Sequence, residues 1–467
     1  MSDIDVLVVG AGPTGLALGI DLARRGVPAL VVERADELFP GSRGKGLQPR
    51  TMEVFDDLGV LDAIHAAGGG YPVGMIWRGG ERIGEHHMAD PAEASDDSPY
   101  NEPWMVPQWR TQRILLERLE ELGGKVVFGR EVTGVTQDED GVTARFASGE
   151  PVRARYLVAA DGGRSVVRRA VGVGMTGEVV DPLPTLVADV RITGLDRDNW
   201  HFFPQGEGAE DLLAICPLAG TEDFQLMARF AEGTEVDLSP EGVRRVVAAR
   251  SHLAAEDVTE VRWVSDFRPR AALADRFRVG RVFLAGDAAH VHSPAGGQGL
   301  NTSVQDAYNL GWKLGAVLGD GARASLLDTY EEERRPIAER MLGLSTSIHR
   351  GETRRGGATR QLDLGYPGST LTAETRTAPG PVRAGDRAPD ATVDGVRLFD
   401  AFRGPHWTLL ALGTSAPAPS ADVRLVHGPA HRTYGTGLFL VRPDGYVGWA
   451  GDTPAGLPEY LARFGGR

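Results

Sequence analysis

The stretch IDVLVVGAGPTGLALGIDLARR, residues 4–25, decides the fold of this chain. Its first six residues are an apolar run rich in β-branched side chains, as expected of a buried parallel strand. A glycine-rich turn follows, and a helical composition then continues as far as Gly26. A second apolar run, residues 27–32, completes a βαβ unit of the usual size. The chain therefore begins with an α/β domain built on a parallel sheet.

The turn between the first strand and its helix carries a G-x-G-x-x-G motif at Gly10, Gly12 and Gly15. The first glycine permits the tight turn, the second lets a pyrophosphate approach the backbone, and the third lets the helix pack on the strand. Glu33, at the end of the second strand, is placed to accept hydrogen bonds from ribose hydroxyls. The pattern predicts a dinucleotide site but does not distinguish NAD from FAD.

A second site follows another apolar strand far downstream, residues 281–285. Gly286 and Asp287 close that strand, where a carboxylate can accept hydrogen bonds from sugar or ribityl hydroxyls. Residues 294–301 then place three glycines in four positions before a helix. Such a loop lets amides press against a flat ring and directs a positive helix end at the charge of a reduced flavin.

Composition narrows the class of protein. The 467 residues predict about three domains. The 50 basic and 64 acidic residues leave a net charge of −14, which disfavours nucleic acid and anionic membrane as partners. Cys216 is the single cysteine, so a disulfide and a cysteine-built metal site are excluded. Neither a signal peptide nor a membrane-spanning stretch is evident, and we expect a cytoplasmic protein.

Three motifs in this order resemble the FAD-dependent aromatic hydroxylases, the single-component class A flavoprotein monooxygenases: the glycine motif, Asp161-Gly162 and Gly286-Asp287. The run from Ala285 to Leu314 is similar to that family nearly residue for residue. The resemblance covers residues 1–345 well and 391–467 more weakly. Within the family, the chain looks most like bacterial enzymes that oxygenate aromatic polyketides and related antibiotics.

The resemblance implies a set of cofactor contacts. Arg43 would reach over the FAD pyrophosphate, where its planar charge suits bidentate contact. Gln108 would lie near the ribityl and phosphate groups, and Asp161 belongs to a motif linked to both FAD and NADPH. The complete set of implied cofactor-binding residues is Gly10, Gly12, Pro13, Thr14, Gly15, Glu33, Arg34, Arg43, Gln108, Val132, Asp161, Gly286, Asp287, Pro294, Gly297, Gly299, Leu300 and Asn301.

The resemblance also implies the fold: a Rossmann-like FAD-binding domain, similar to that of para-hydroxybenzoate hydroxylase, with an inserted antiparallel-sheet substrate domain and a thioredoxin-like C-terminal domain. Short β-like runs over residues 184–230 and at 73–83 support the insertion. The expected divisions are 1–72, 100–180 and 269–348 for the FAD-binding domain, 73–99 and 181–268 for the substrate domain, 349–390 for a connector and 391–467 for the C-terminal domain. That last domain lacks cysteine, so we expect packing or dimerisation rather than dithiol chemistry.

The function implied is a monooxygenase that uses FAD, NADPH or NADH, and O₂ to hydroxylate an aromatic, polycyclic polyketide-type substrate through a flavin C4a-hydroperoxide. No side-chain base is identified, and the supporting loop is that of Pro294, Gly296 and Gly297. Baeyer–Villiger or antibiotic-inactivating oxygenation by the same chemistry remains open. A catalytically inactive flavin-binding scaffold is an alternative of another class.

The aromatic residues of the sheet domain are candidates for the substrate pocket. We expect some of them to line its floor: Trp77, Trp104, Phe202, Phe224 and Trp263. No metal is expected, because the flavin site uses the sequence around His290 and His292. No Ser/His/Asp set in a nucleophile-elbow context is present. The partner is then a small aromatic molecule, and the chain is expected to be a monomer or homodimer.

Overall fold

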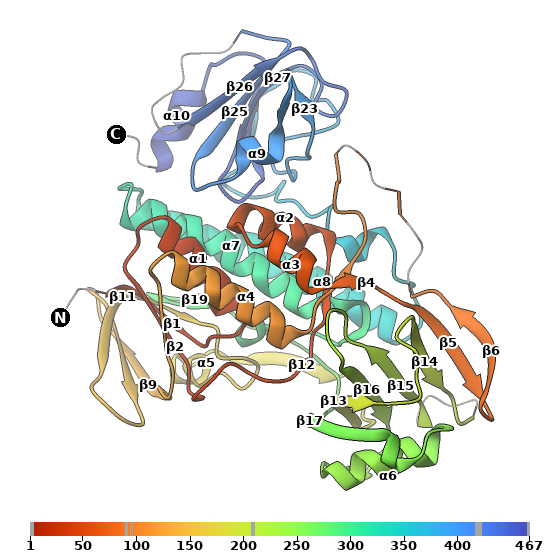
Figure 1. Ribbon diagram of the computed structural model, residues 1–467. Coiled ribbons are helices and arrows are strands. Elements are labelled where there is room, and N and C mark those ends of the chain that lie inside the picture. Colours follow the sequence, from red (N-terminus) through yellow and green to blue (C-terminus); the bar gives the residue numbers. More distant parts are fainter. Residues whose placement is uncertain are drawn as a thin grey trace.

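The computed structural model describes residues 4–88, 92, 93, 95, 97–206, 211–415 and 423–464. Figure 1 shows three parts: a large α/β body, a second sheet beside it, and a C-terminal sheet packed against the helices. No helix within these ranges is long and apolar enough to cross a membrane. The expected divisions that include residues 1–3, 89–91 or 465–467 extend outside the described residues.

The α/β body is built on a largely parallel sheet in the order β19-β20-β11-β1-β2-β8, in which β19 alone of these six runs antiparallel. A hairpin of β9 and β10 extends β11. The strands are β1 (Ile4–Val9), β2 (Ala29–Val32), β8 (Val126–Val127), β9 (Val132–Gln137), β10 (Val142–Phe146), β11 (Val152–Ala159), β19 (Arg278–Val279) and β20 (Val282–Leu284). The G-x-G-x-x-G strand is therefore central, as the βαβ pattern predicts.

Helices α1 and α7 pack against each other over this sheet, and α4 lies on the other side of α1 (Figure 1). Close packing of α1 and α7 depends on Gly311, because a Cβ there would lie 2.1 Å from Asp21 Oδ2. The helices are α1 (Pro13–Arg24), α2 (Pro49–Leu58), α3 (Leu61–Ala67), α4 (Gln108–Glu121), α5 (Val166–Ala170), α7 (Gly299–Leu318) and α8 (Thr329–His349).

The second sheet has seven strands in the order β17-β13-β16-β15-β14-β5-β6, with α6 (Pro240–Arg250) packed against β17. Its strands are β5 (Val73–Arg78), β6 (Glu81–His86), β13 (Thr185–Ile192), β14 (Asn199–Phe203), β15 (Leu213–Pro217), β16 (Phe224–Arg229) and β17 (Val258–Phe267). Residues 73–86 thus join strands made more than a hundred residues later.

The β-like fragment at residues 73–83 belongs to a hairpin of two strands, because Gly79 and Gly80 turn the chain with positive φ. One expectation for this sheet needs correction. The sheet is not wholly antiparallel, since β5 pairs with β14 in parallel. The long stretch of chain between β5 and β14 crosses over, so that β14 enters the sheet running in the same direction as β5.

Two three-stranded sheets connect the α/β body to the second sheet. One is β3-β7-β4, made of β3 (Gly46–Leu47), β4 (Gly69–Gly70) and β7 (Trp104–Met105). The other is β12-β18-β21, made of β12 (Met175–Val179), β18 (Arg270–Ala274) and β21 (His290–Val291). Each crossing of the chain between the two bodies is therefore tied by backbone pairing.

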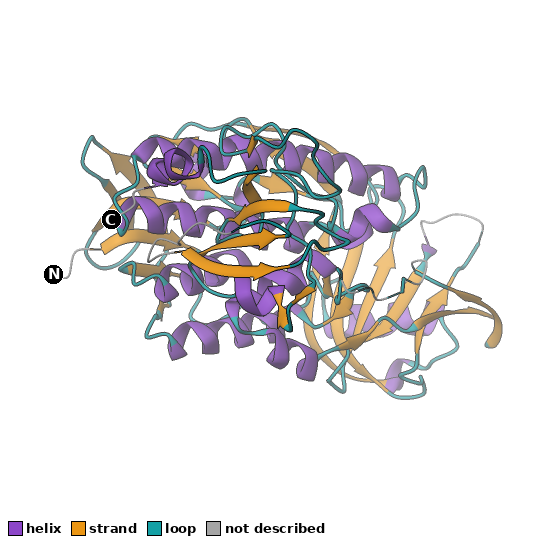
Figure 2. Ribbon diagram, turned by 90° about the horizontal axis from the view of Figure 1, so that it is seen from above, coloured by secondary structure: helices purple, strands orange, loops and turns teal. Residues whose placement is uncertain are grey.

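The C-terminal sheet has the order β22-β28-β27-β25-β26 and lies over the helices in both views (Figures 1 and 2). Its elements and their neighbours are β22 (Ala373–Glu374), β23 (Thr392–Val393), β24 (Val396–Arg397), α9 (Leu398–Phe402), β25 (Trp407–Leu412), β26 (Val423–Gly428), β27 (Gly437–Val441), β28 (Val447–Gly451) and α10 (Leu457–Leu461). The expected connector, residues 349–390, is not a simple linker, because its β22 pairs with β28.

A buried charge cluster fastens this sheet to α7 and α8. The Glu333 carboxylate accepts hydrogen bonds from Lys313 Nζ at 2.7 Å and from Arg442 Nη1 at 2.6 Å, and all three side chains are almost fully buried. Burial alone would raise the pKa of Glu333, but Arg442 and Lys313 hold it far below its usual value. Because the anion compensates two buried cations, the cluster holds its three elements together.

Replacing Glu333 tests this junction. The substitution Glu333→Ala leaves Lys313 buried without its carboxylate and leaves Arg442 paired with Asp444 alone, which costs about 3–5 kcal/mol of unfolding free energy. Chemical denaturation measures the loss, and Glu339→Gln, an exposed position of the same helix, is the control. Equal stability of the two variants would contradict a structural role for the cluster.

Candidate active site

One large cavity of about 1840 Å³ lies between the carboxyl edge of the parallel sheet and the second sheet. Residues after β1, β2, β11 and β20 all line it, which is the edge where open α/β sheets bind their ligands. Its volume exceeds the roughly 300–1,000 Å³ of an ordinary ligand pocket. The cavity can therefore hold a large cofactor together with a substrate.

The N-terminus of α1 faces one part of this cavity. No side chain caps the helix, and Pro13 occupies its first turn, so the remaining first-turn amides are free for a ligand. Gly12 lines the cavity, and a Cβ added there would meet nothing within 4 Å. Gly15 has a different role, since a Cβ there would lie 2.0 Å from Gly10 O. The motif thus combines one open position with one packing position.

Glu33 closes the same end of the cavity. Its Oε2 accepts a hydrogen bond from the Ala11 amide at 2.9 Å, and its Oε1 accepts one from the Ala35 amide at 3.1 Å. The carboxylate is therefore fixed beside the glycine turn, where the sequence predicted it. Its contact with a ribose stays a prediction.

The N-terminus of α7 faces another part of the cavity. It too has no side-chain cap, and the preceding Gly296 and Gly297 adopt positive φ of 79° and 65°. Asn301 holds this turn: its Oδ1 accepts from the Gln48 amide at 2.8 Å, and its Nδ2 donates to Gly297 O at 2.7 Å. The protein's own groups therefore hold the conformation of the loop.

A chain of three polar side chains anchors the start of this loop. Ser293 Oγ lies 3.0 Å from His349 Nδ1, and His349 Nε2 lies 3.0 Å from Asp181 Oδ2. These three residues are far apart in the chain, so no local pattern indicates their contact, and the prediction of no Ser/His/Asp set in a nucleophile-elbow context does not concern them. Ser293 Oγ also accepts a hydrogen bond from the Ala295 amide at 3.4 Å, so the chain fixes the loop to α8 and to the second sheet's border.

A second buried network of hydrogen-bonded side chains lies behind the Gly286–Asp287 turn. Asp306 on α7 accepts hydrogen bonds from the Gly286 amide at 3.0 Å and from Arg334 Nε at 2.8 Å, and it lies 2.6 Å from His290 Nε2. Burial alone would raise the pKa of Asp306, but His290 and Arg334 keep it below its usual value. His290 is thus engaged by a carboxylate, and its imidazole positions the turn.

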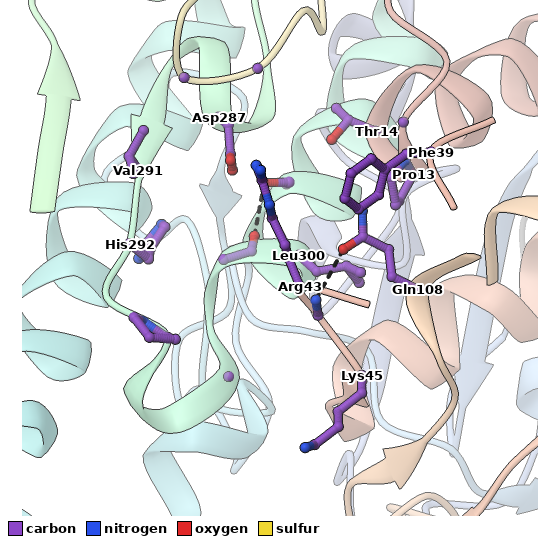
Figure 3. A pocket seen from close by; sticks show the side chains of 18 of the residues that line it. Pro13, Thr14, Phe39, Arg43, Lys45, Gln108, Asp287, Val291, His292 and Leu300 are labelled. Atoms are coloured by element: carbon purple, nitrogen blue, oxygen red, sulfur yellow. Dashed lines mark hydrogen bonds between the residues drawn. The ribbon is translucent and has the colours of Figure 1, made fainter. Parts of the chain in front are cut away.

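Arg43 and Asp287 point into the cavity from opposite walls (Figure 3). The surrounding protein raises the pKa of Asp287, although His290 and Arg43 counteract the effect. Gln108 Oε1 accepts a hydrogen bond from the Gly44 amide at 3.0 Å, which fixes the loop that carries Arg43. The predicted phosphate and ribityl contacts therefore surround one space.

Asp161 lies at the end of β11 and also faces the cavity. Its Oδ2 accepts hydrogen bonds from the Val166 and Val167 amides, whereas its Oδ1 is buried without a partner. Burial raises the pKa of this carboxyl. An unpartnered buried oxygen at the cavity wall is a free hydrogen-bond acceptor.

The structure brings most of the predicted cofactor residues to this cavity. Those that line it are Gly10, Gly12, Pro13, Thr14, Glu33, Arg34, Arg43, Gln108, Val132, Asp161, Asp287, Pro294, Gly297, Gly299 and Leu300. The other three residues of that set, Gly15, Gly286 and Asn301, stand behind the wall instead, as does Gly296 of the predicted supporting loop. They serve turns and close packing, so their contribution to a ligand is indirect.

The substrate prediction needs a larger correction. Of the five aromatic residues named for it, Trp263 lines the cavity and the other four do not. Trp77 and Phe224 pack in the core on the far face of the second sheet. Trp104 Nε1 donates to Ile64 O at 3.2 Å, and Phe202 stacks on Trp200 at 5.2 Å. Alternation along the strands accounts for Trp77 and Phe224, whereas Phe202 stacks on the cavity residue Trp200 and Trp104 belongs to the β3-β7-β4 sheet.

The cavity wall that the sequence missed comes from the other face of the same strands. Trp200, Gln225 and Met227 line it, together with Lys45 from the loop after Arg43 and Tyr71 before β5. A period-2 reading of β16 separates Gln225 and Met227 from the core residues Phe224 and Leu226. This alternation can be recognised in the sequence, but it does not predict which face of the sheet lies toward the cofactor domain.

Asp189 lies on this face of the sheet, behind the cavity wall. Both of its carboxylate oxygens are buried without a hydrogen-bond partner. Burial raises its pKa from 3.8 to about 6, although Ser42 and Lys45 favour the charged form. An acid of this kind destabilises the fold when it ionises.

The residues present fit FAD. The cavity has two uncapped helix N-termini for anionic groups, a positively charged side chain in Arg43, and open positions at Gly12 and Gly162, where a Cβ would meet nothing within 4 Å. The carboxylates of Asp161 and Asp287 line the same cavity and supply acceptors for hydroxyl groups.

Comparisons with known proteins agree with this geometry. A family model described as FAD binding domain matches residues 3–345, and one described as aromatic-ring hydroxylase, C-terminal, matches residues 382–467. A flavin-dependent monooxygenase of Mycobacteroides abscessus is 47% identical over 98% of this chain and 99% of its own. A rifampicin monooxygenase of Rhodococcus hoagii is 33% identical over 99% and 98%.

A solved structure gives the same result. The chain is similar to aklavinone-11 hydroxylase, crystallised as a ternary complex with FAD and aklavinone, with a TM-score of 0.84 and 30% identity over 99% of both chains. It is also similar to an anhydrotetracycline hydroxylase from Streptomyces rimosus, with a TM-score of 0.79 and 31% identity over 99% of both chains.

The two glycines of the first motif should respond differently to the same change. We expect Gly12→Ala to fold normally and to bind FAD at least about tenfold more weakly, since one methyl then occupies the ligand's approach. Gly15→Ala should instead lower the melting temperature, because its Cβ collides with Gly10 O. Flavin fluorescence titration and thermal unfolding separate the two effects. Normal FAD affinity of a folded Gly12→Ala variant would contradict the assignment.

Asp189 predicts a pH-dependent stability. Its folded pKa of about 6 exceeds the unfolded value of 3.8. The contribution of the neutral Asp189 carboxyl to the free energy of unfolding is therefore intact below pH 3.8 and is lost as the pH rises through 6. We expect Asp189→Asn to gain up to about 3 kcal/mol over the wild type near pH 8, and about nothing near pH 4. Urea unfolding at both pH values measures the difference, with exposed Asp266→Asn as the control. A gain independent of pH would refute this origin.

Proposed function

Because the chain belongs to the FAD-dependent aromatic-ring hydroxylases and is an FAD-dependent monooxygenase, we propose that it hydroxylates a polycyclic aromatic compound of polyketide type. The relatives named above act, by their names, on rifampicin, anhydrotetracycline and aklavinone. The large cavity and its aromatic wall at Trp200 and Trp263 support a substrate of several fused rings.

One observation carries the proposal. The uncapped N-termini of α1 and α7 open into the same cavity, one after the dinucleotide glycines and one after the Pro294–Gly299 loop. A single extended cofactor with an anionic pyrophosphate and an electron-accepting ring would match both ends. The space remaining beside the second helix end borders the second sheet, where the substrate would lie.

In this proposal the helix α1 amides and Arg43 hold the pyrophosphate, and Glu33 holds the adenosine ribose. Asp287 and Gln108 hold the ribityl region. The amides of Gly297, Gly299 and Leu300 face the isoalloxazine ring, and Pro294 bounds it. The remaining cavity residues of the predicted set, Arg34, Val132 and Asp161, border the same cofactor.

The chemistry divides between cofactor and chain. Bound FAD, reduced by NADPH or NADH, supplies the means to activate O₂ and transfer one oxygen atom to the substrate. The chain binds both molecules, places the aromatic carbon near the ring, and encloses the site against water. The positive end of α7 would favour negative charge on a group bound beside it.

The C-terminal sheet is proposed to be thioredoxin-like in topology. Strand β25 is parallel to β26 and antiparallel to β27, and β27 continues antiparallel to β28. Because the chain's single cysteine is Cys216, this sheet has no dithiol. We propose that the C-terminal sheet holds α7 in place through the Glu333 cluster.

The function is tested with purified, FAD-loaded protein and a panel of aromatic polyketides. A substrate should stimulate NADPH oxidation, and the product should carry one atom from ¹⁸O₂, detected by mass spectrometry. An oxygen inserted between carbons would instead identify Baeyer–Villiger chemistry. A protein that takes up FAD but consumes no NADPH with any aromatic compound would be a flavin-binding scaffold, and the proposal would be wrong.

A further inference from the structure

Lysine is scarce in this protein. Three lysines, Lys45, Lys125 and Lys313, account for the 50 basic residues together with 47 arginines. Lys125 is exposed, and Lys313 is buried in the Glu333 cluster. Lys45 lines the active-site cavity. A compact, mobile ammonium group is therefore used in the cavity of a chain that otherwise uses planar guanidinium groups.

Lys45 belongs to a loop, residues 41–46, that crosses the second sheet. Gly41 lies so close to Trp263 that a Cβ would be 2.2 Å from its ring. The Ser42 carbonyl accepts a hydrogen bond from Gln225 Nε2. Arg43 and Lys45 then extend toward different ends of the cavity (Figure 3). The loop thus delivers one positive charge to the predicted pyrophosphate site and another to the substrate wall.

The ammonium group of Lys45 is held by neutral partners. Its Nζ donates to Gln225 Oε1 at 2.6 Å and lies 4.3 Å from the centre of the Trp200 ring. The Gln225 amide is oriented for this contact, because its Nε2 donates to Ser42 O. Gln225 thus takes one ammonium proton, the neutral Cys216 thiol interacts with the same group, and the Trp200 face supports the charge without neutralising it.

The ionisable groups near Lys45 do not provide a contact anion. Burial raises the pKa of Tyr71 to about 12 and raises that of the Cys216 thiol, so both remain neutral at physiological pH. Asp189 is the nearby acid and ionises above its pKa of about 6, but its oxygens lie behind the wall and do not contact the ammonium group. Among the described residues, no carboxylate forms an ion pair or hydrogen bond with Lys45. A half-buried ammonium group at the cavity wall with no carboxylate in contact favours an anionic ligand on its cavity side.

We propose that Lys45 binds an anionic oxygen of the substrate, so that the site selects polycyclic aromatic compounds with an ionised phenol or enol. This inference rests on the proposed function of the same cavity. Gln225 orients the ammonium group, and Trp200 forms the adjoining wall. An ionised oxygen also raises electron density at its ortho and para carbons, which are the positions that accept an electrophilic oxygen atom.

The test uses FAD-loaded protein without nicotinamide, so that binding is measured apart from turnover. The probes are emodin, a trihydroxyanthraquinone with an acidic phenol, and its fully O-methylated ether, which cannot ionise. Flavin absorbance changes give both dissociation constants. The wild type should bind the phenol at least about tenfold more tightly than the ether, as expected of a charge-assisted hydrogen bond.

Three variants then identify the source of this preference. Lys45→Met, similar in length and uncharged, should lower the phenol-to-ether ratio to about one, whereas Lys45→Arg should retain part of it. Lys125→Met, on the exposed surface, should match the wild type. An unchanged ratio in Lys45→Met, or equal weakening of both probes, would overturn the proposal, because a merely structural lysine does not distinguish an ionised ligand from its ether.

A second measurement needs no variant. Emodin changes colour when it ionises, so a pH titration of the bound probe gives its apparent pKa in the wild-type site. That pKa should lie below the value in free solution, and an equal or higher value would refute the proposal. If emodin binds as the anion while no aromatic compound is oxygenated, the proposed function fails and Lys45 keeps its role. If oxygenation occurs with an unchanged ratio, this inference alone fails.

Discussion

The close packing of α1 against α7 is the constraint on which the rest of the structure depends. Gly311 lets the two helices approach until the Asp21 carboxylate occupies the space of a missing side chain. Both helices start at the carboxyl edge of one parallel sheet, and neither has a side-chain cap. Their contact therefore fixes the relative position of two sets of free amides, separated by about 285 residues of chain. A long anionic cofactor can bind both sets of amides at once because their relative position is fixed.

The other parts of the molecule support this pair. Asp306 on α7 receives the Gly286 amide and Arg334 from α8, so the helix also positions the Asp287 turn. At its far end, α7 is held by the buried carboxylate of Glu333, which joins it to the C-terminal sheet. The C-terminal sheet thus acts on the active site through helix placement, without touching the cavity.

The sequence predicted the features that depend on local spacing. The glycine motif, Glu33 and the Pro294–Asn301 loop each lie within one strand–turn–helix unit, so their residues meet wherever the unit folds. Two kinds of feature could not be predicted. The chains Ser293–His349–Asp181 and Asp306–Arg334 join distant segments, and no local pattern records such pairing. The substrate wall was misjudged because alternation separates Phe224 from Gln225 without indicating which face meets the loop of Lys45.

The discontinuous sheets also set an order of events during synthesis. The dinucleotide glycines leave the ribosome first, but β20 and α7, which complete the cavity, follow only after residue 281. Likewise β5 and β6 wait for β14, more than a hundred residues later, before their edge is paired. The nascent chain therefore exposes unpaired strand edges until about two-thirds of it is made, and such edges are prone to aggregation. The cofactor site is consequently completed late, because the segments that line it extend to Arg360.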